Sequence, residues 1–303
     1  MKYNNILDLI GNTPLIKVHL TKKGDATVLA KLEFLNPGGS IKDRMALYMI
    51  EMVEKRRILK PGMTIIEATT GNTGIAFAMI SAIKGYNFMA VMPEDMTIEK
   101  QNLMKAYGAK VILTATSKGP LGAIEKKNQL AKEIKNVWLP SQFDNPDNIT
   151  AHRKSIGQEI IKQTKGRIDA FVAGVGTGGT LMGVGEALKA LNPKIKIIAV
   201  EPAESAVLSG GKAGYHQIQG IGESFIPELV DLKMIDQIER VSTKGAKQMT
   251  RKLALKEGIL AGISSGANVV ASLRVAKRLG EGKTVITVLP DRGERYFSQN
   301  IFN

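Results

Sequence analysis

The chain has 303 residues, of which 44% are hydrophobic and 23% charged, and its formal net charge is +14. This composition is that of a globular protein with room for about two domains, and it excludes disordered and collagen-like classes. Because the chain has no cysteine and only three histidines, we expect no disulfide, no cysteine nucleophile and no metal site.

The positive charge alone is compatible with nucleic-acid binding, but its distribution argues against it. Lysines alternate with glutamates in amphipathic stretches such as IEKKNQLAKEIK, residues 124–135, and only 5% of residues are aromatic. We therefore expect a solvated basic surface and no nucleic-acid partner. The N-terminus lacks the apolar run of a secretory signal, and no stretch has the length of a membrane span. These features predict a cytoplasmic protein without membrane contact.

A unit of a short β-rich run, a turn and a helical pattern recurs along the chain. In the first half, strands are predicted over 64–69, 88–92 and 110–113, and helices over 75–85, 97–108 and 119–134. In the second half, strands are predicted over 168–174, 194–200 and 284–290, and a helix over 180–191. Apolar runs without alternation are typical of parallel strands covered on both faces. The sequence predicts an α/β fold of two doubly wound domains with mainly parallel sheets.

The boundary between the two domains must lie in a loop, because no low-complexity linker is present. The segment LPSQFDNPDN, residues 139–148, is rich in Pro, Asn and Asp and separates two of the repeating blocks. We therefore predict a domain boundary near residue 146.

The loop GVGTGGT, residues 174–180, carries the strongest single signal. A glycine-rich turn between a strand and a helix presents backbone N–H groups and the positive helix end to a phosphate. Gly174, Gly176 and Gly179 also satisfy the dinucleotide pattern, and Glu201 follows at the distance of a ribose-binding acid. From this loop alone, a nicotinamide-dependent oxidoreductase is a reasonable alternative.

Three further loops have polar residues at or near the start of a predicted helix. Such residues either bind a ligand or simply cap the helix. TTGNTG, residues 69–74, offers neutral donors for a carboxylate at a helix start, and no counter-cation is required there. In GISSGAN, residues 262–268, a serine caps the next helix or points into a cleft. In NPGGSIKDR, residues 36–44, a helix is expected to open on Ser40, with Lys42 in its first turn, where the helix dipole disfavours a cation. Either the Lys42 amine is solvated, or it takes part in the chemistry of the protein.

In this order, the four segments resemble the cysteine synthase branch of the pyridoxal-phosphate enzymes related to tryptophan synthase β. The resemblance runs from IGNTPL at 10–15 to PDRGERY at 290–296. It implies fold type II, a homodimer, and pyridoxal 5'-phosphate in the cleft between two α/β domains. The smaller, mobile domain over 35–145 would bind the substrate, and the larger one, which combines 1–34 with 146–303, would bind the cofactor phosphate. Its partners would be small amino-acid substrates.

The resemblance also implies a role for each residue of the motifs. Lys42 would form the Schiff base with the cofactor and later act as the base at the substrate α-carbon. Asn72 would contact the phenolic oxygen, and Ser264 the pyridine nitrogen. The phosphate would lie on Gly176, Thr177, Gly178, Gly179 and Thr180, and the substrate carboxylate on Thr69, Thr70, Gly71 and Thr73, with Gln142 closing on it.

A serine at the ring nitrogen leaves the pyridine largely unprotonated, so the resemblance implies loss of a β-substituent to an aminoacrylate rather than transamination. O-Acetylserine with sulfide, giving cysteine, is the default substrate pair. The alternative is consumption of cysteine with release of sulfide, giving serine, lanthionine or cystathionine.

Two departures from the family bear on the substrate. The pair Thr69-Thr70 stands where relatives commonly have Thr-Ser, and Glu223 follows the second glycine of QGIGESFIP, where ordinary cysteine synthases usually have a small residue. Such a carboxylate would repel hydrosulfide and pair with the ammonium of a second amino acid, or it is simply an exposed loop residue.

Overall fold

Two β-sheets, each with helices on both faces, organise the chain in the computed structural model, which describes residues 3–302. The smaller sheet has strand order β5-β4-β3-β6 and is parallel throughout. The larger sheet has order β1-β2-β10-β7-β8-β9 and is parallel except for the antiparallel pair β1–β2. The strands are β1 (Leu15–Lys17), β2 (Thr27–Leu32), β3 (Thr64–Ala68), β4 (Asn87–Pro93), β5 (Lys110–Thr114), β6 (Val137–Trp138), β7 (Ala170–Gly174), β8 (Lys196–Pro202), β9 (Gln237–Val241) and β10 (Thr284–Leu289).

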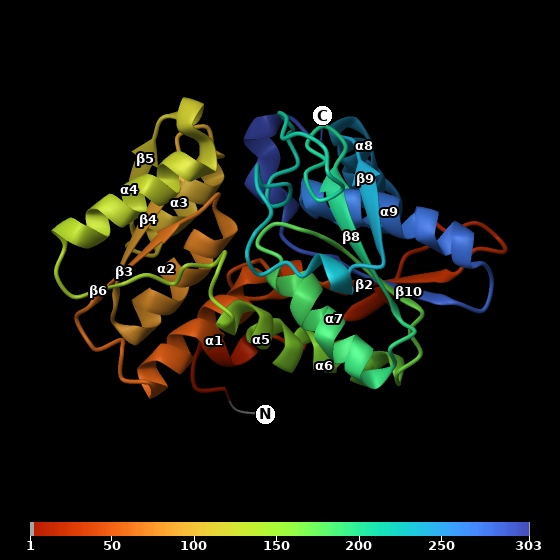
Figure 1. Cartoon of the computed structure of the whole chain (residues 1–303), viewed down its shortest axis with the longest axis horizontal. Helices are drawn as coiled ribbons and strands as arrows, with labels where there is room; N and C mark the ends of the chain where they lie inside the picture. The colour runs from red at the N-terminus through yellow and green to blue at the C-terminus, as the bar shows by residue number, and fades with distance from the viewer. Residues whose placement is uncertain (1–2, 303) are drawn as a thin grey trace.

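The helices follow the strands as the repeating pattern predicts, and the α/β fold class is confirmed (Figure 1). They are α1 (Lys42–Lys55), α2 (Asn72–Lys84), α3 (Ile98–Ala106), α4 (Gly119–Glu133), α5 (Asp147–Lys154), α6 (Ile156–Thr164), α7 (Gly179–Leu191), α8 (Thr243–Glu257) and α9 (Ile263–Leu279). Short 3-10 helices lie between them, the last being η5 (Gly293–Gln299).

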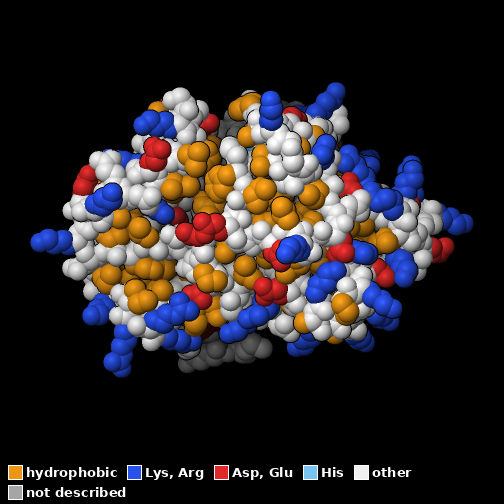
Figure 2. Space-filling view, in the orientation of Figure 1, with side chains coloured by type: hydrophobic (Ala, Val, Ile, Leu, Met, Phe, Trp, Pro, Cys, Tyr) orange, Lys and Arg blue, Asp and Glu red, His pale blue; other side chains and the backbone are white. Residues whose placement is uncertain are grey.

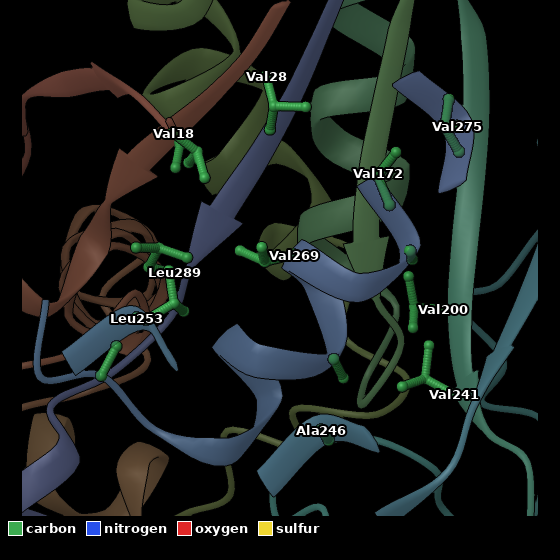
Figure 3. Close-up of a cluster of buried hydrophobic side chains, with 14 of the residues drawn as sticks. Val18, Val28, Val172, Val200, Val241, Ala246, Leu253, Val269, Val275 and Leu289 are labelled. Atoms are coloured by element: carbon green, nitrogen blue, oxygen red, sulfur yellow. The ribbon is translucent and has the colours of Figure 1, made fainter. Parts of the chain in front are cut away.

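Each sheet buries both faces because neighbouring strand residues point to opposite sides. In the smaller sheet, Ile65 joins a core with α1 and α2, whereas Ile66 packs toward Ala123 of α4. In the larger sheet, Val172 belongs to the core shown in Figure 3, which includes α8 and α9, and Phe171 belongs to the core on the α7 side. This two-sided burial explains why the strands read as apolar runs without alternation.

The strands of the smaller sheet all fall inside 35–145, and those of the larger sheet fall outside it. The cores are less cleanly divided, since Leu7 and Ala151 join the core of the smaller sheet. The two ends of the chain meet in the larger sheet, where β2 pairs in parallel with β10. A division into two units that move relative to each other stays a prediction.

Basic side chains are scattered over the face shown in Figure 2, with acidic and apolar side chains between them. This agrees with the solvated basic surface expected from the sequence. No helix within residues 3–302 combines the length and the apolar character that a membrane crossing requires.

Candidate active site

A cavity lies at the carboxyl ends of the parallel strands, with walls from both sheets' loops. This is where open α/β sheets place their ligands. The space between the walls of the cavity, counted together with the open solvent at its mouth, is about 960 Å³. Of the fourteen residues assigned to a site from the sequence, Gly71 and Gly179 do not line it. The other twelve do: Lys42, Thr69, Thr70, Asn72, Thr73, Gln142, Gly176, Thr177, Gly178, Thr180, Glu223 and Ser264.

Lys42 is the first residue of α1, so the helix begins two residues later than expected on Ser40. Ser40 instead forms a β-bridge with Asp291, and its Oγ accepts a hydrogen bond of 3.3 Å from the Lys42 backbone N–H. Within residues 3–302, the Lys42 side chain has no hydrogen-bond or ion-pair partner. Burial lowers the pKa of Lys42 to about 8, and the carboxylates of Glu223 and Asp291 oppose this shift. The lowered pKa makes the neutral, nucleophilic amine easier to reach at physiological pH than it is for an ordinary lysine.

The glycine loop after β7 forms a tight concave surface at the start of α7. Gly178 has φ +87°, a conformation that favours glycine, and is the N-cap of the helix. A Cβ at Gly176 would lie 2.4 Å from the Gly220 carbonyl oxygen, and one at Gly179 would lie 2.1 Å from Asn148 Oδ1. The loop therefore requires glycines so that backbone donors at the helix N-terminus face the cavity, as a phosphate site needs.

Two hydroxyls flank this loop. Asn148 Nδ2 donates a hydrogen bond of 3.1 Å to Thr177 Oγ1, and Thr180 Oγ1 lies 3.3 Å from Nε2 of the buried His152. Burial and the nearby cations Lys42 and Arg44 keep the pKa of His152 well below its usual range. The imidazole is therefore neutral at physiological pH. Neither Asn148 nor His152 was predicted from the sequence, because both come from α5, whose helical pattern carries no chemical signature.

The loop before α2 is held by its own side chains and by Gln142. Thr69 Oγ1 accepts hydrogen bonds from the backbone N–H groups of Gly71 and Gly74, at 2.9 and 3.1 Å, so its hydroxyl caps the helix. Thr73 Oγ1 donates to Gln142 Oε1 at 2.7 Å, and Gln142 Nε2 donates to the Ala68 carbonyl at 2.9 Å. The structure therefore brings Gln142 onto the substrate loop, as the resemblance implies.

The Asn72 side-chain amide is oriented by two charged residues near the C-terminus. Its Nδ2 donates to Asp291 Oδ2 at 2.7 Å, and its Oδ1 accepts from Arg295 Nη1. Asp291 is fully buried and also accepts a 2.5 Å hydrogen bond from the Tyr296 hydroxyl. The side-chain amide of Asn72 is therefore held in one orientation at the wall of the cavity. The motif PDRGERY holds Asp291, Arg295 and Tyr296, so the signal was present in the sequence without an assigned role.

Ser264 and Glu223 also face the cavity without partners in the described chain. Ser264 lies in the first turn of α9 and is 3% exposed. Glu223 lies on the loop between β8 and β9, where burial raises its pKa and the Lys42 cation opposes the rise. Glu223 is thus a wall residue of the cavity, rather than an exposed loop residue.

Glu201, the residue that would bind a ribose in a nicotinamide enzyme, is used elsewhere. It is buried, and its carboxylate accepts hydrogen bonds from the Leu208 backbone at 2.8 Å and from the Ser209 hydroxyl. It does not line the cavity. The geometry therefore gives no support to the dinucleotide interpretation of the glycine loop.

Comparison with known proteins decides the family. The model of the family described as "Pyridoxal-phosphate dependent enzyme" matches residues 6–291. The chain belongs to this family. It is 50% identical over 302 residues to a cysteine synthase of Staphylococcus aureus, covering 99% of this chain and 97% of that protein.

Solved structures of the family superpose on the whole chain. An O-acetylserine dependent cystathionine beta-synthase from Helicobacter pylori has a TM-score of 0.95, 43% identity and full coverage of both chains. A hydrogen sulfide-producing enzyme from Fusobacterium nucleatum has a TM-score of 0.95 and 44% identity, and covers 97% of this chain and 100% of that one. The fold-type-II architecture expected from the sequence is confirmed.

The residues present fit the cofactor of the family, pyridoxal 5'-phosphate. The glycine cradle would hold its phosphate, since added side chains at Gly176 and Gly179 would collide with backbone or buried polar atoms. The unpartnered Ser264 hydroxyl would face the ring nitrogen, and the oriented Asn72 amide the phenolic oxygen. The Lys42 amine, which has no partner within residues 3–302, would attach the cofactor. These individual roles remain predictions.

Proposed function

We propose that this chain catalyses replacement of the β-substituent of a serine or cysteine derivative, with O-acetylserine and sulfide giving cysteine as the default pair. The observation that carries the proposal is the unpartnered Lys42 amine, which opens into one cavity with the glycine cradle and Ser264. The names of the relatives, a cysteine synthase and an O-acetylserine dependent enzyme, support the same chemistry.

The bound cofactor supplies an electron sink, which makes the substrate α-proton removable and allows the β-substituent to leave. The protein supplies position and proton transfer. Lys42 would hold the cofactor through Nζ, and once the substrate amine has taken its place the released neutral amine would accept the α-proton at Nζ. Backbone N–H groups at the start of α2, with Thr73 and Gln142, hold the substrate carboxylate. Because Ser264 is a hydroxyl rather than a carboxylate, it does not stabilise a protonated ring nitrogen, and elimination is favoured over transamination.

The test is a spectrum, a reduction and a product assay on the purified protein. We expect a visible cofactor absorbance, and after borohydride reduction we expect mass spectrometry to place the cofactor on Lys42. The Lys42→Ala variant should fold and lack both covalent cofactor and turnover. Cofactor found on Lys31 or Lys212, or no cofactor at all, would contradict the proposal. Formation of cysteine from O-acetylserine and sulfide identifies the default pair.

Glu223 favours a second candidate, in which an amino-acid thiol is the nucleophile and cysteine is a substrate. Its carboxylate lines both the cavity and the adjoining pocket at its mouth. A negative charge there opposes the approach of hydrosulfide, whereas it attracts the ammonium of a second amino acid. Sulfide release from cysteine alone, with serine, lanthionine or cystathionine as products, would identify this activity.

The smaller domain over 35–145 and the homodimer implied by the resemblance remain part of the proposal. We propose that the smaller domain moves when an amino acid binds, because loops of both sheets line the cavity. Size-exclusion chromatography with light scattering reads out the oligomeric state, and a monomer would contradict the homodimer.

A further inference from the structure

Lys100, on α3, is a buried cation without a counter-ion. It is 2% exposed, yet within residues 3–302 no carboxylate lies within ion-pair distance of its ammonium. Its Nζ donates to Gln219 Oε1 at 2.5 Å and lies 4.6 Å from the ring centroid of Tyr296, and both partners are neutral. By contrast, the buried Lys31 forms an ion pair of 2.6 Å with Glu159. A buried charge is costly when it is unpaired, so an anion from outside the chain would complete the site.

The position of Lys100 indicates which anion. Its side chain lines the cavity and passes directly behind the substrate loop, where a Cβ at Gly71 would lie 2.3 Å from Lys100 Cδ. Gly71 has φ +134°, and the loop backbone makes this close approach only because glycine is present. The ammonium therefore lies beside the N-terminus of α2, where backbone donors already attract an anion.

The Lys100 ammonium also contacts the loop that carries Glu223. Gln219, the hydrogen-bond partner of Lys100, lines the mouth pocket together with Thr70 and Glu223. Gln219 is neutral, so it holds the ammonium in place without neutralising its charge. Asp291 is the acidic residue with the largest electrostatic effect on Lys100, but it forms no ion pair with Lys100, and its Oδ2 accepts hydrogen bonds from Asn72 and Tyr296. The positive charge is thus available to a ligand that lies between the two loops.

We propose that Lys100 recognises the carboxylate of an amino-acid ligand and supplies the counter-charge that the neutral donors of the 69–73 loop lack. This inference rests on the proposed function, since it assumes that the cavity binds amino acids. A carboxylate between the loops would draw the ammonium from Gln219 into a charge-assisted hydrogen bond. The carboxylate belongs either to the first amino acid, on the α2 loop, or to the amino-acid nucleophile whose ammonium faces Glu223.

The first experiment removes the charge and compares two ligands. Lys100→Met is titrated with L-alanine and with L-alaninamide, which lacks the carboxylate, and binding is followed by the cofactor absorbance. We expect L-alanine affinity to fall about tenfold or more, and L-alaninamide affinity to stay unchanged. Lys100→Arg should restore part of the loss. Lys105→Met is the matched control, because Lys105 is an exposed lysine on the same helix.

The second experiment keeps Lys100 and gives it an internal counter-ion. Gln219→Glu places a carboxylate at the position that now holds the neutral oxygen 2.5 Å from Nζ. We expect this variant to retain the cofactor and to bind L-alanine about tenfold more weakly, because the ammonium is already paired. Gln219→Met is the control: it removes the hydrogen bond to Lys100 but adds no negative charge to neutralise the ammonium. If Gln219→Glu leaves both the affinity for L-alanine and the KM for L-homocysteine unchanged, Lys100 has only a structural role.

A comparison of two thiol nucleophiles, one with and one without a carboxylate, shows which amino acid supplies the carboxylate that Lys100 binds. If the nucleophile is the source, Lys100→Met should raise the KM for L-homocysteine and leave the KM for cysteamine, which lacks a carboxylate, unchanged. The inference is overturned if Lys100→Met binds L-alanine and uses L-homocysteine as the wild type does, or if ligands with and without a carboxylate lose equally. Because these outcomes are read on cofactor-loaded, active protein, they are distinct from failure of the proposed function.

Discussion

At the scale of single residues, environment decides what each ionisable group does. Lys31, Lys42 and Lys100 are all shielded lysines, but Lys31 is paired with Glu159, whereas Lys42 and Lys100 face the cavity without ion pairs in the described chain. Burial lowers the pKa of both Lys42 and Lys100 to about 8. Lys42 therefore supplies a neutral amine readily. Lys100 retains its charge most fully once an anion is bound, because an adjacent opposite charge raises a lysine pKa.

Glu223 gives the residue-scale prediction. If its carboxylate recruits the ammonium of a second amino acid, Glu223→Ala should lower kcat/KM for cysteine or homocysteine as nucleophile about tenfold, which corresponds to about 1.4 kcal/mol. The kcat/KM for sulfide should hold or improve, since a repulsive charge is removed. Steady-state kinetics with O-acetylserine at saturation give both values. If kcat/KM falls equally for all nucleophiles, or for none, Glu223 does not select the nucleophile, and the default pair of O-acetylserine and sulfide is favoured.

At the scale of elements, the site is made by loops that end strands and begin helices. The loop after β3 leads into α2, and the loop after β7 leads into α7, so both helices direct their N-termini at the same cavity. Because each helix N-terminus carries a partial positive charge, the pair suits a ligand with two anionic groups. A phosphate on one loop and a carboxylate on the other meet this requirement.

Gly178 gives the element-scale prediction. Gly178→Asp adds a negative charge to the phosphate loop, and its Cβ would lie 2.5 Å from Val230 Cγ2. We expect the purified variant to lose most of its cofactor absorbance while its circular dichroism stays folded. The matched control is Gly24→Asp, at a glycine of similar φ, +89°, with open space around it. Stoichiometric cofactor in Gly178→Asp would place the phosphate elsewhere.

At the scale of the whole molecule, the two expected domains are joined on the α1 side and again around the cavity. Arg44 of α1 forms buried ion pairs of 2.6 Å with both Glu33 and Glu159, which belong to the other expected domain. At the cavity mouth, contacts between the two include the ring pair Phe143–Phe225, with centroids 5.4 Å apart. We predict a motion that opens the mouth and keeps the ion-paired side fixed, and this motion would break cavity contacts such as the hydrogen bond of Lys100 with Gln219.

The predicted motion is measurable because the chain has no cysteine to interfere with labelling. Spin labels at Leu121 on α4 and Leu255 on α8, both exposed, report the distance between the two domains. We expect the distance distribution to shift when L-alanine is added to the cofactor-loaded protein. Labels at Leu255 and Lys283, both in the larger domain, serve as the control. An unchanged Leu121–Leu255 distribution would contradict a mobile smaller domain.

The sequence by itself determined the local features of this protein. Turn chemistry and side-chain periodicity depend on residues that are close together in the sequence. The local sequence therefore predicts the conformation of the glycine loop at 174–180, of the hydroxyl-rich loop at 69–74 and of the apolar strands. These signals were sufficient for the fold class and for the loops that form the cavity. They also located strands β3, β4, β5, β7, β8 and β10 and helices α2, α3, α4 and α7. The start of α1 was misplaced by two residues, because Ser40 is held by Asp291, which is remote in sequence.

Only the tertiary structure decided which distant residues meet. In the sequence, nothing distinguishes Lys100 from the other lysines of amphipathic helices. Only the fold places it against Gly71 and Gln219. The orientation of Asn72 by Asp291 and Arg295 likewise joins positions more than two hundred residues apart. The larger sheet closes only when β2 pairs with β10, from the other end of the chain. No local pattern encodes such contacts, because their energy exists only once long-range packing brings the groups together.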